Sequence, residues 1–195
     1  MTPLRFALAG RDLPVDRALV LAQVEPAAAA VDAALAQGAD LLDLGSADPA
    51  FVAEVRARHP RLALAATPGD AAGLCAAGAD LLDVTGADPA TAAAAARHGA
   101  ALIAAGLEPG VTGLLDCPAG PGLLQRLAEP APWPRLITLP DNGSGDAALA
   151  VAALAAWRGV QVVRTREVPR VRQALEMAAS INGSRPPAAV LRALT

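Results

Sequence analysis

A thirteen-residue segment occurs twice in this chain, and its two copies lie forty residues apart. Residues 38–50 read GADLLDLGSADPA and residues 78–90 read GADLLDVTGADPA, which are identical at ten of thirteen positions. In each copy a glycine suited to a helix end precedes a short apolar run. An Asp-Pro pair follows, in which the aspartate suits a helix N-cap and the proline suits the first helical position. Each copy therefore predicts a β-strand followed directly by an α-helix.

Short apolar runs and helical intervals alternate in the same way over the rest of the chain. Besides the two copies, runs typical of strands occupy residues 18–24, 62–66, 100–105, 113–117, 136–139 and 161–165. Near-continuous apolar runs are typical of parallel strands that are buried on both faces. The sequence therefore predicts an α/β fold, a compact (β/α)8 TIM-type barrel, in which residues 1–195 form a single domain. An open doubly wound sheet is the alternative, but the glycine-rich phosphate fingerprint is absent.

Two departures from a regular barrel are expected. Residues 4–12 predict an N-terminal β-hairpin before the first barrel strand, placed to close the bottom of the barrel. Residues 106–112, between the fifth and sixth strands, are fewer than the roughly twelve residues that a parallel crossover needs, so one helix is missing there. We expect the outer faces of those two strands to form an exposed apolar patch that a partner chain covers.

Composition excludes several classes of function. The net charge is −3 and the arginines are scattered, so no basic face is offered to nucleic acid. The longest uncharged apolar stretch, residues 147–157, is much shorter than the roughly 18 residues that cross a bilayer, and the N-terminus lacks a signal-peptide pattern. The two cysteines have no metal-ligand spacing, so no metal site is predicted. We therefore expect a cytoplasmic protein.

The residues resemble the dihydropteroate synthase family, whose pterin-binding barrel makes the folate precursor. The segment GADLLDLGS is similar to that family's second strand and GADLLDVTG to its fourth. The segment VVRTREVPRVRQALEMAASI is similar to its last strand and helix, and the opening residues resemble its hairpin and first strand. The family's Asn-Val-Thr-Pro motif corresponds here to Gln23-Val24-Glu25-Pro26. The resemblance covers nearly the whole chain.

The family's pterin-binding positions are only partly kept. The resemblance places the family's strand-three aspartate on Ala66 and its strand-four asparagine on Leu82, beside a retained Asp83. Strand six keeps Asp116. After strand seven, where the family has Ser-Arg-Lys, this sequence reads PDNG at residues 140–143, and the chain contains no lysine. In strand eight Arg164 matches an anion-binding arginine.

The two loops that close over the family's substrates are also shortened. Pro26 leads almost directly into a helix, and the second loop is reduced to residues 45–48. Because such loops exclude water from the reaction, and because each lost polar group costs about 3 kcal/mol of transition-state stabilisation, we expect little or no synthase activity. The resemblance implies Mg²⁺, which bridges the diphosphate in the family, as the one cofactor to consider.

The candidate substrate-binding residues are Gln23, Asp43, Asp83, Asp116 and Arg164, and no catalytic residue is assigned. Strand ends on one side of a barrel form its active site, so these side chains are expected together. The alternative is that the aspartates only accept hydrogen bonds from loop amides and helix N-termini.

A second question concerns the arginines in the last strand. Arg164 and Arg166 lie two residues apart and face the same way in a strand. They form either an anion site or ion pairs with Asp141 and Asp146.

Three functions remain open at this stage. The chain binds a pterin or related heterocycle without turnover, or it is a non-catalytic pseudoenzyme that acts as a structural or regulatory partner, or it is an active minimal synthase. By resemblance to the family, we expect a homodimer or a heterodimer with a full-length synthase.

Overall fold

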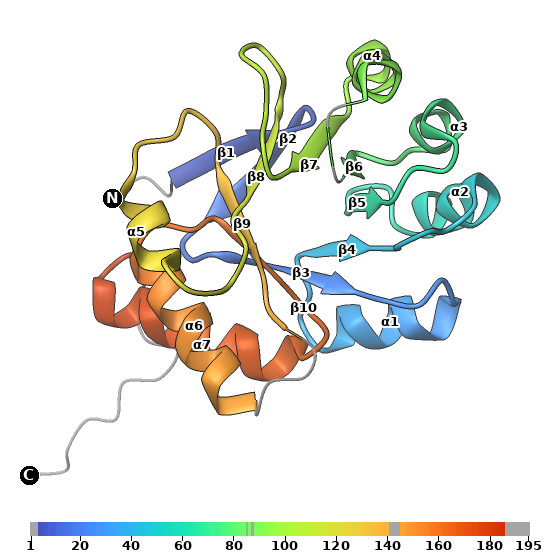
Figure 1. Ribbon diagram of the computed structural model, residues 1–195. Coiled ribbons are helices and arrows are strands. Elements are labelled where there is room, and N and C mark those ends of the chain that lie inside the picture. Colours follow the sequence, from blue (N-terminus) through green and yellow to red (C-terminus); the bar gives the residue numbers. More distant parts are fainter. Residues whose placement is uncertain (1–3, 85, 87, 141–144, 186–195) are drawn as a thin grey trace, which may run out of the picture.

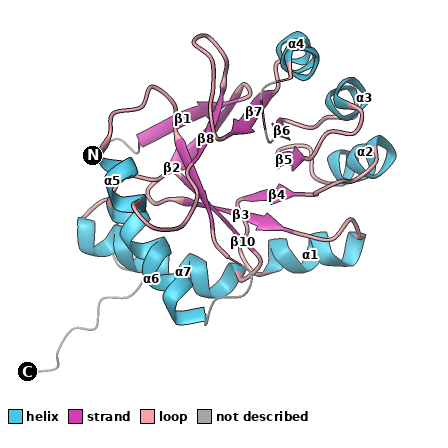
Figure 2. Ribbon diagram, viewed as in Figure 1, coloured by secondary structure: helices cyan, strands magenta, loops and turns pink. Residues whose placement is uncertain are grey.

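The computed structural model describes residues 4–84, 86, 88–140 and 145–185. Within these residues, eight parallel strands close into a barrel, with seven helices outside it (Figure 1; Figure 2). The strands in chain order are β3 (Leu19–Gln23), β4 (Leu41–Asp43), β5 (Ala63–Ala66), β6 (Leu81–Asp83), β7 (Ala101–Ala104), β8 (Gly113–Asp116), β9 (Arg135–Thr138) and β10 (Val162–Thr165). The predicted barrel is confirmed, and β10 pairs with β3 to close it, so the open-sheet alternative is wrong.

Six helices occupy the intervals between the predicted strands, and the seventh follows the last strand. They are α1 (Ala28–Ala36), α2 (Pro49–Arg58), α3 (Ala71–Ala76), α4 (Pro89–His98), α5 (Leu123–Ala128), α6 (Gly145–Trp157) and α7 (Val168–Asn182). The N-caps of α2 and α4 are the repeated aspartates. Asp48 accepts a hydrogen bond from the Phe51 backbone N–H, and Asp88 accepts one from the Thr91 N–H. The Asp-Pro pair of each copy therefore starts a helix as predicted.

Alternate residues of each strand belong to two different cores. Inside the barrel lie Leu19, Leu21, Leu41, Ala63, Ala65, Leu81, Ala101, Ile103, Leu114, Leu136 and Val162. The intervening strand residues pack outward against the helices, together with side chains such as Val31 and Val52. Because both faces of the strands are buried, the strands show continuous apolar runs rather than a polar alternation.

An antiparallel hairpin formed by β1 (Leu4–Leu8) and β2 (Arg11–Val15) precedes the barrel. Leu8 is almost fully buried and joins the interior core, with Ala9 and Leu13 packed against it. Arg11 forms an ion pair with Asp80, directly before β6. The predicted hairpin and its place at the N-terminal end of the barrel are confirmed.

The third residue of each repeat, Asp40 or Asp80, binds the neighbouring strand. Asp40 accepts a hydrogen bond from the Val20 backbone N–H at 2.8 Å, and Asp80 accepts one from the Leu64 N–H at 2.9 Å. Each carboxylate also forms an ion pair with an arginine, Arg17 for Asp40 and Arg56 for Asp80. The repeat therefore specifies a link between adjacent strands as well as a strand and a helix.

The first residue of each repeat is a glycine that the backbone requires. Gly38 and Gly78 have φ of +96° and +105°, a region that favours glycine. A Cβ on Gly38 would lie 2.8 Å from the Arg172 side chain, and one on Gly78 would lie 2.9 Å from the Arg56 side chain. Each of these arginines donates to the carbonyl of the glycine it covers. The arginine thus closes over the turn where the preceding helix ends.

The connection between β7 and β8 has no helix, as predicted, but the strand faces beneath it are not exposed. Leu102 and Ala104, which point outward from β7, are each only 1% exposed. Leu107 and Val111 of the loop pack against the outer core, and the Trp133 indole N–H donates to the Val111 carbonyl at 2.9 Å. The expectation of an exposed apolar patch here is wrong, because the loop itself covers the strands.

No helix in the described part of the chain is long and apolar enough to cross a membrane.

We predict that Asp80→Ala lowers the free energy of unfolding by about 3 kcal/mol, because it leaves Arg56, Arg11 and the Leu64 N–H without their shared acceptor. Urea unfolding followed by circular dichroism measures the change. The matched control is Asp32→Ala. The Asp32 side chain is 52% exposed and pairs with Arg58, so its loss should lower the free energy of unfolding by less than about 1 kcal/mol. Equal losses in the two variants would contradict this role for Asp80.

Candidate functional site

A ring of polar side chains lies at the C-terminal end of the barrel strands. On six strands, the side chains that point into the barrel are apolar at first, and the last one is polar. Barrel enzymes have their active sites at this C-terminal end of the strands. The ring residues are Gln23 on β3, Asp43 on β4, Asp83 on β6, Asp116 on β8, Thr138 on β9 and Arg164 on β10. All five residues predicted as substrate-binding therefore lie at one end of the barrel.

Arg164 crosses the barrel to the opposite wall. Its guanidinium Nη1 lies 2.8 Å from Asp83 Oδ2, although β10 and β6 are separated by three strands on either side of the barrel. Its Nε lies 3.4 Å from Asp43 Oδ2. Arg164 is 6% exposed. A buried guanidinium and two carboxylates from three strands thus form the centre of the ring.

Four buried atoms of the ring have no hydrogen-bond partner among the described residues. They are Nε and Nη2 of Arg164, Oδ1 of Asp116 and Oγ1 of Thr138. Buried polar atoms are nearly always paired with protein, water or a ligand, because an unpaired one costs about 1–3 kcal/mol. These atoms come from three strands, β8, β9 and β10, that are adjacent in the barrel. The ring therefore offers guanidinium N–H donors on Arg164, a carboxylate acceptor on Asp116 and a hydroxyl on Thr138 that can donate or accept, to a bound molecule or to water.

Burial changes the acidity of two carboxyl groups in the ring. Desolvation raises the pKa of Asp43 above its ordinary value, while Arg164 and the Gly45 backbone N–H, at 3.0 Å, oppose that rise. Desolvation also raises the pKa of Asp116, again opposed by Arg164. The hydrogen bond from Gly45 shows that Asp43 does bind a loop amide, as the alternative interpretation of the aspartates expected. Arg164 is a second partner that the alternative did not include.

Arg166 lies outside the ring. It follows the last residue of β10, is half-exposed and forms an ion pair with Glu25 at 3.3 Å. Asp146 instead pairs with Arg170 at 2.7 Å, so the expected ion pair between Asp146 and either strand arginine is wrong. Asp141, the other expected partner, lies outside the described residues. Arg164 and Arg166 therefore each have carboxylate partners of their own, and the shared anion site stays a prediction.

Sequence reasoning did not single out Thr138. It lies two residues after Leu136, which faces the barrel interior, so the period of two along a strand places Thr138 in the ring. That alternation was the available signal, since the two residues belong to one predicted apolar run.

Comparison with known proteins places this arrangement in context. No family model matches the chain. The structure of Rv1207 from Mycobacterium tuberculosis is 30% identical, with a TM-score of 0.78 over 93% of this chain and 100% of that chain. A dihydropteroate synthase structure from Thermus thermophilus has a TM-score of 0.75 over 92% of this chain and 100% of that chain, at 22% identity. A Mycobacterium leprae protein named inactive dihydropteroate synthase 2 is 40% identical over 74 residues.

The chain belongs to the dihydropteroate synthase family. It is a short member, with 195 residues. The alignment with the Mycobacterium leprae protein covers 32% of this chain and only 25% of that protein's length. The similarity to solved synthases extends over the whole barrel and therefore supports the fold at every strand.

Two positions that the family resemblance connects with pterin binding do not face the mouth of this barrel. Ala66 and Leu82 are fully buried and belong to the outer core, which packs against the helices. The strand residues that face inward next to them are Ala65 and Leu81. The apolar side chains of Ala66 and Leu82 suit the layer between the strands and the helices. Neither side chain can contact a ligand bound in the ring.

The ring does not fit a magnesium ion held by its carboxylates. No group of three or more acidic, histidine or cysteine side chains is placed to hold a metal within the described part of the chain. Asp43 and Asp83 instead face the guanidinium of Arg164, which supplies the positive charge between them. We therefore derive no step through the Mg²⁺ that the family resemblance implied.

Arg164→Met should lower the free energy of unfolding by about 3 kcal/mol at pH 7, because it leaves the buried Asp43 and the partly buried Asp83 without their cation. The variant should also raise the pKa of Asp43 and of Asp116 further, since Arg164 lowers both. A carboxyl whose pKa is raised in the folded state binds its proton before the unfolded chain does, so the destabilisation should shrink as the pH falls from 7 to about 4.

Urea unfolding at both pH values, with NMR titration of the side-chain carboxyl carbons, measures these effects. Arg58→Met is the control, because Arg58 is 38% exposed and pairs with the exposed Asp32. Its cost should stay below about 1 kcal/mol at both pH values. A pH-independent loss in Arg164→Met would contradict the assigned ion pairs.

Proposed function

We propose that this protein binds a pterin or a related amino-heterocycle at the mouth of its barrel and has little or no synthase activity. The observation that supports the proposal is the set of buried, unpaired atoms on Asp116, Thr138 and Arg164. A heterocycle that carries donors and acceptors along one edge would satisfy these atoms. Below the ring, Leu21, Ile103 and Leu136 form an apolar floor suited to a flat ring system.

The charge of the ring favours a ligand with N–H donors. Asp43, Asp83 and Asp116 surround the single guanidinium of Arg164, so carboxylates outnumber cations. The amino group and ring N–H of a pterin donate hydrogen bonds, which carboxylates accept. An anionic ligand would instead meet excess negative charge in a partly desolvated site. The proposed ligand is therefore a neutral heterocycle rather than a phosphate ester.

The same charge distribution explains why the family's reaction would fail here. A synthase of this family uses a pterin diphosphate, and a diphosphate needs cations. Arg164 is already engaged by two carboxylates, and the chain contains no lysine. Only residues 24–27 separate β3 from α1, and only residues 44–48 separate β4 from α2, so these connections are short. The name of the Mycobacterium leprae relative, an inactive dihydropteroate synthase, supports the same conclusion.

Isothermal titration calorimetry with hydroxymethylpterin tests the binding. We expect saturable binding by the wild type and a Kd at least tenfold higher in Asp116→Asn. The asparagine amide has one acceptor oxygen instead of two and lacks the negative charge of the carboxylate. Asp32→Asn, on the exposed side of α1, should bind like the wild type. Absence of binding in the wild type would contradict the proposed function.

A synthase assay with the pterin diphosphate, p-aminobenzoate and Mg²⁺ tests the second half of the proposal. We expect no product above the background reaction. Turnover by the wild type that disappears in Asp116→Asn would show that the chain is an active minimal synthase, the alternative retained from the sequence.

A further inference from the structure

A cavity of about 460 Å³ lies at the opposite end of the barrel from the ring. It is lined by Leu35 of α1, by Asp40 directly before β4, and by residues 58–62, which end α2 and lead into β5. All these residues precede a strand rather than follow one, so the cavity is at the N-terminal end of the strands. We call it the base cavity.

The lining of the base cavity combines apolar and cationic side chains. Leu35, Pro60 and Leu62 are apolar, and Arg58 and Arg61 carry positive charge. The two leucines are partly buried, whereas the two arginines are exposed. The cavity therefore has an apolar floor and a cationic rim, which suits a ligand that is apolar at one end and charged at the other.

The two arginines at the rim have unused donors. Among the described residues, Arg61 has no hydrogen bond or ion pair. Arg58 donates two hydrogen bonds to Asp32, at 2.7 and 2.8 Å, and both come from Nη2. A guanidinium has five N–H groups in a fixed plane, so Arg58 and Arg61 together still offer several donors to an anion.

The carboxylate of Asp40, which also lines the base cavity, is balanced by other arginines. Arg17 donates to both of its oxygens at 2.8 Å, and Arg172 lies 3.7 Å away. Asp32 in turn is the partner of Arg58. Each aspartate near the cavity thus has its own cation, and the charge left over is that of Arg61. The surplus charge is therefore positive and favours an anionic ligand.

His59 adds a buried atom that lacks a partner. Its Nε2 is buried and accepts or donates no hydrogen bond among the described residues. It lies 3.7 Å from Asp32 Oδ1, which is beyond hydrogen-bond distance. Buried polar atoms are nearly always paired with protein, water or a ligand. Because His59 lines the base cavity, a molecule bound there is placed to supply this partner.

The loop that carries these groups is held in place by the protein. Arg56 donates hydrogen bonds to three of its backbone carbonyls, those of His59, Pro60 and Leu62. Arg11 of the hairpin donates a further one to the Pro60 carbonyl at 3.3 Å. The wall of the base cavity is thus already ordered in the free chain, so a ligand would pay little entropy for ordering it.

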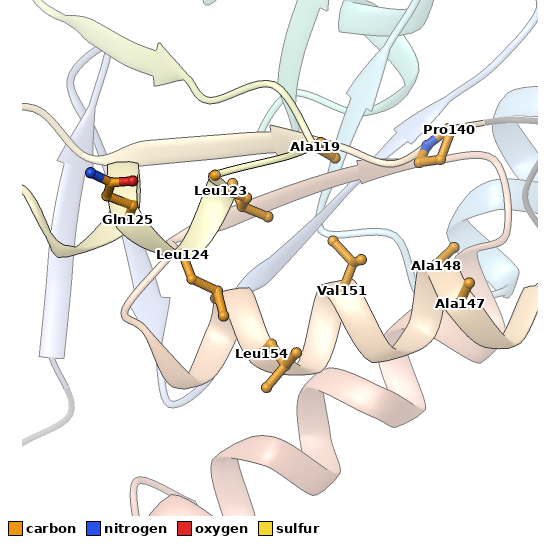
Figure 3. Close-up of a pocket in the computed structure, with 11 residues that line it drawn as sticks. Ala119, Leu123, Leu124, Gln125, Pro140, Ala147, Ala148, Val151 and Leu154 are labelled. Carbon is orange, nitrogen blue, oxygen red and sulfur yellow. The ribbon is translucent and has the colours of Figure 1, made fainter.

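A groove of similar volume on the flank of the barrel lacks such groups. It lies between α5 and α6, has a volume of about 430 Å³, and Figure 3 shows Leu124, Val151 and Leu154 beside it. Among the described residues that line it, Gln125 has the only polar side chain and none is charged. The groove therefore offers no partner to an anion, unlike the base cavity.

We propose that the base cavity binds an aliphatic carboxylate. The carboxylate accepts hydrogen bonds from Arg61, from Arg58 and from Nε2 of His59, and the aliphatic chain lies against Leu35 and Leu62. An inorganic anion would leave the apolar floor uncovered, and a cation would meet the surplus positive charge. The base cavity and the ring lie at opposite ends of the barrel, so this proposal is independent of the proposed pterin site.

A two-dimensional ¹H–¹⁵N NMR titration with hexanoate, up to about 20 mM at constant ionic strength, tests the proposal. We expect saturable shifts of the Leu35, Arg61 and Leu62 amides. Acetate lacks the chain and hexanamide lacks the charge, so each should bind about tenfold more weakly. Absence of saturable shifts with hexanoate would overturn the proposal. Equal affinity for hexanamide, or shifts confined to the groove at Leu124 and Val151, would also overturn it.

Four variants test the assigned groups. Arg61→Gln should weaken hexanoate binding about tenfold, and Arg61→Lys should keep the affinity within about threefold because it keeps the charge. Arg61 is exposed, so circular dichroism should show both variants folded. The matched control is Arg97→Gln, at an exposed position of α4, which should bind like the wild type.

The fourth variant should strengthen binding. Asp32→Asn removes the carboxylate that competes for Arg58, so hexanoate should bind about threefold more tightly, and the gain should shrink at high salt. A gain in affinity cannot result from a damaged fold. Binding by Arg61→Gln that equals that of the wild type, or weaker binding by Asp32→Asn, would contradict the assigned contacts.

Discussion

The ion pairs of Arg164 join opposite walls of the barrel at its mouth. One buried guanidinium contacts Asp83 across the barrel and lies near Asp43 on a third strand. A buried charge is tolerated only when it is paired, so the two carboxylates and the arginine depend on one another. This interaction fixes which atoms of the ring remain unpaired. It also engages the cation that a diphosphate would need.

Stabilising contacts of the repeats and the candidate site lie at opposite ends of the barrel. At the N-terminal end, the repeated Gly-Ala-Asp segments hold neighbouring strands through Asp40 and Asp80, to which Arg17 and Arg56 donate hydrogen bonds. At the C-terminal end, the second aspartate of each repeat, Asp43 or Asp83, faces Arg164. The same short motif therefore serves the fold with its first aspartate and the candidate site with its second.

Local patterns predicted the strands, the hairpin and the absent helix, because each depends on spacing within a few residues. The inward direction of Asp43, Asp83 and Asp116 follows from the period of two along a strand, and the same rule places Thr138. Contacts between distant residues were not predictable in this way. Arg164 and Asp83 are 81 residues apart, and Arg166 and Glu25 are 141 apart. Nothing local to residues 106–112 indicated that Trp133 would hold the loop over β7.

We propose the mouth of the barrel, with its unpaired atoms on β8, β9 and β10, as the ligand site of this protein. The most direct measurement is a two-dimensional ¹H–¹⁵N NMR titration of the chain with hydroxymethylpterin, which reports the location of binding independently of its strength. If the ligand binds there, the backbone amide signals that change are those at the strand ends, including Gly45, Cys117 and Leu139. Changes confined to α6 and α7, or to the hairpin end of the barrel, would contradict it.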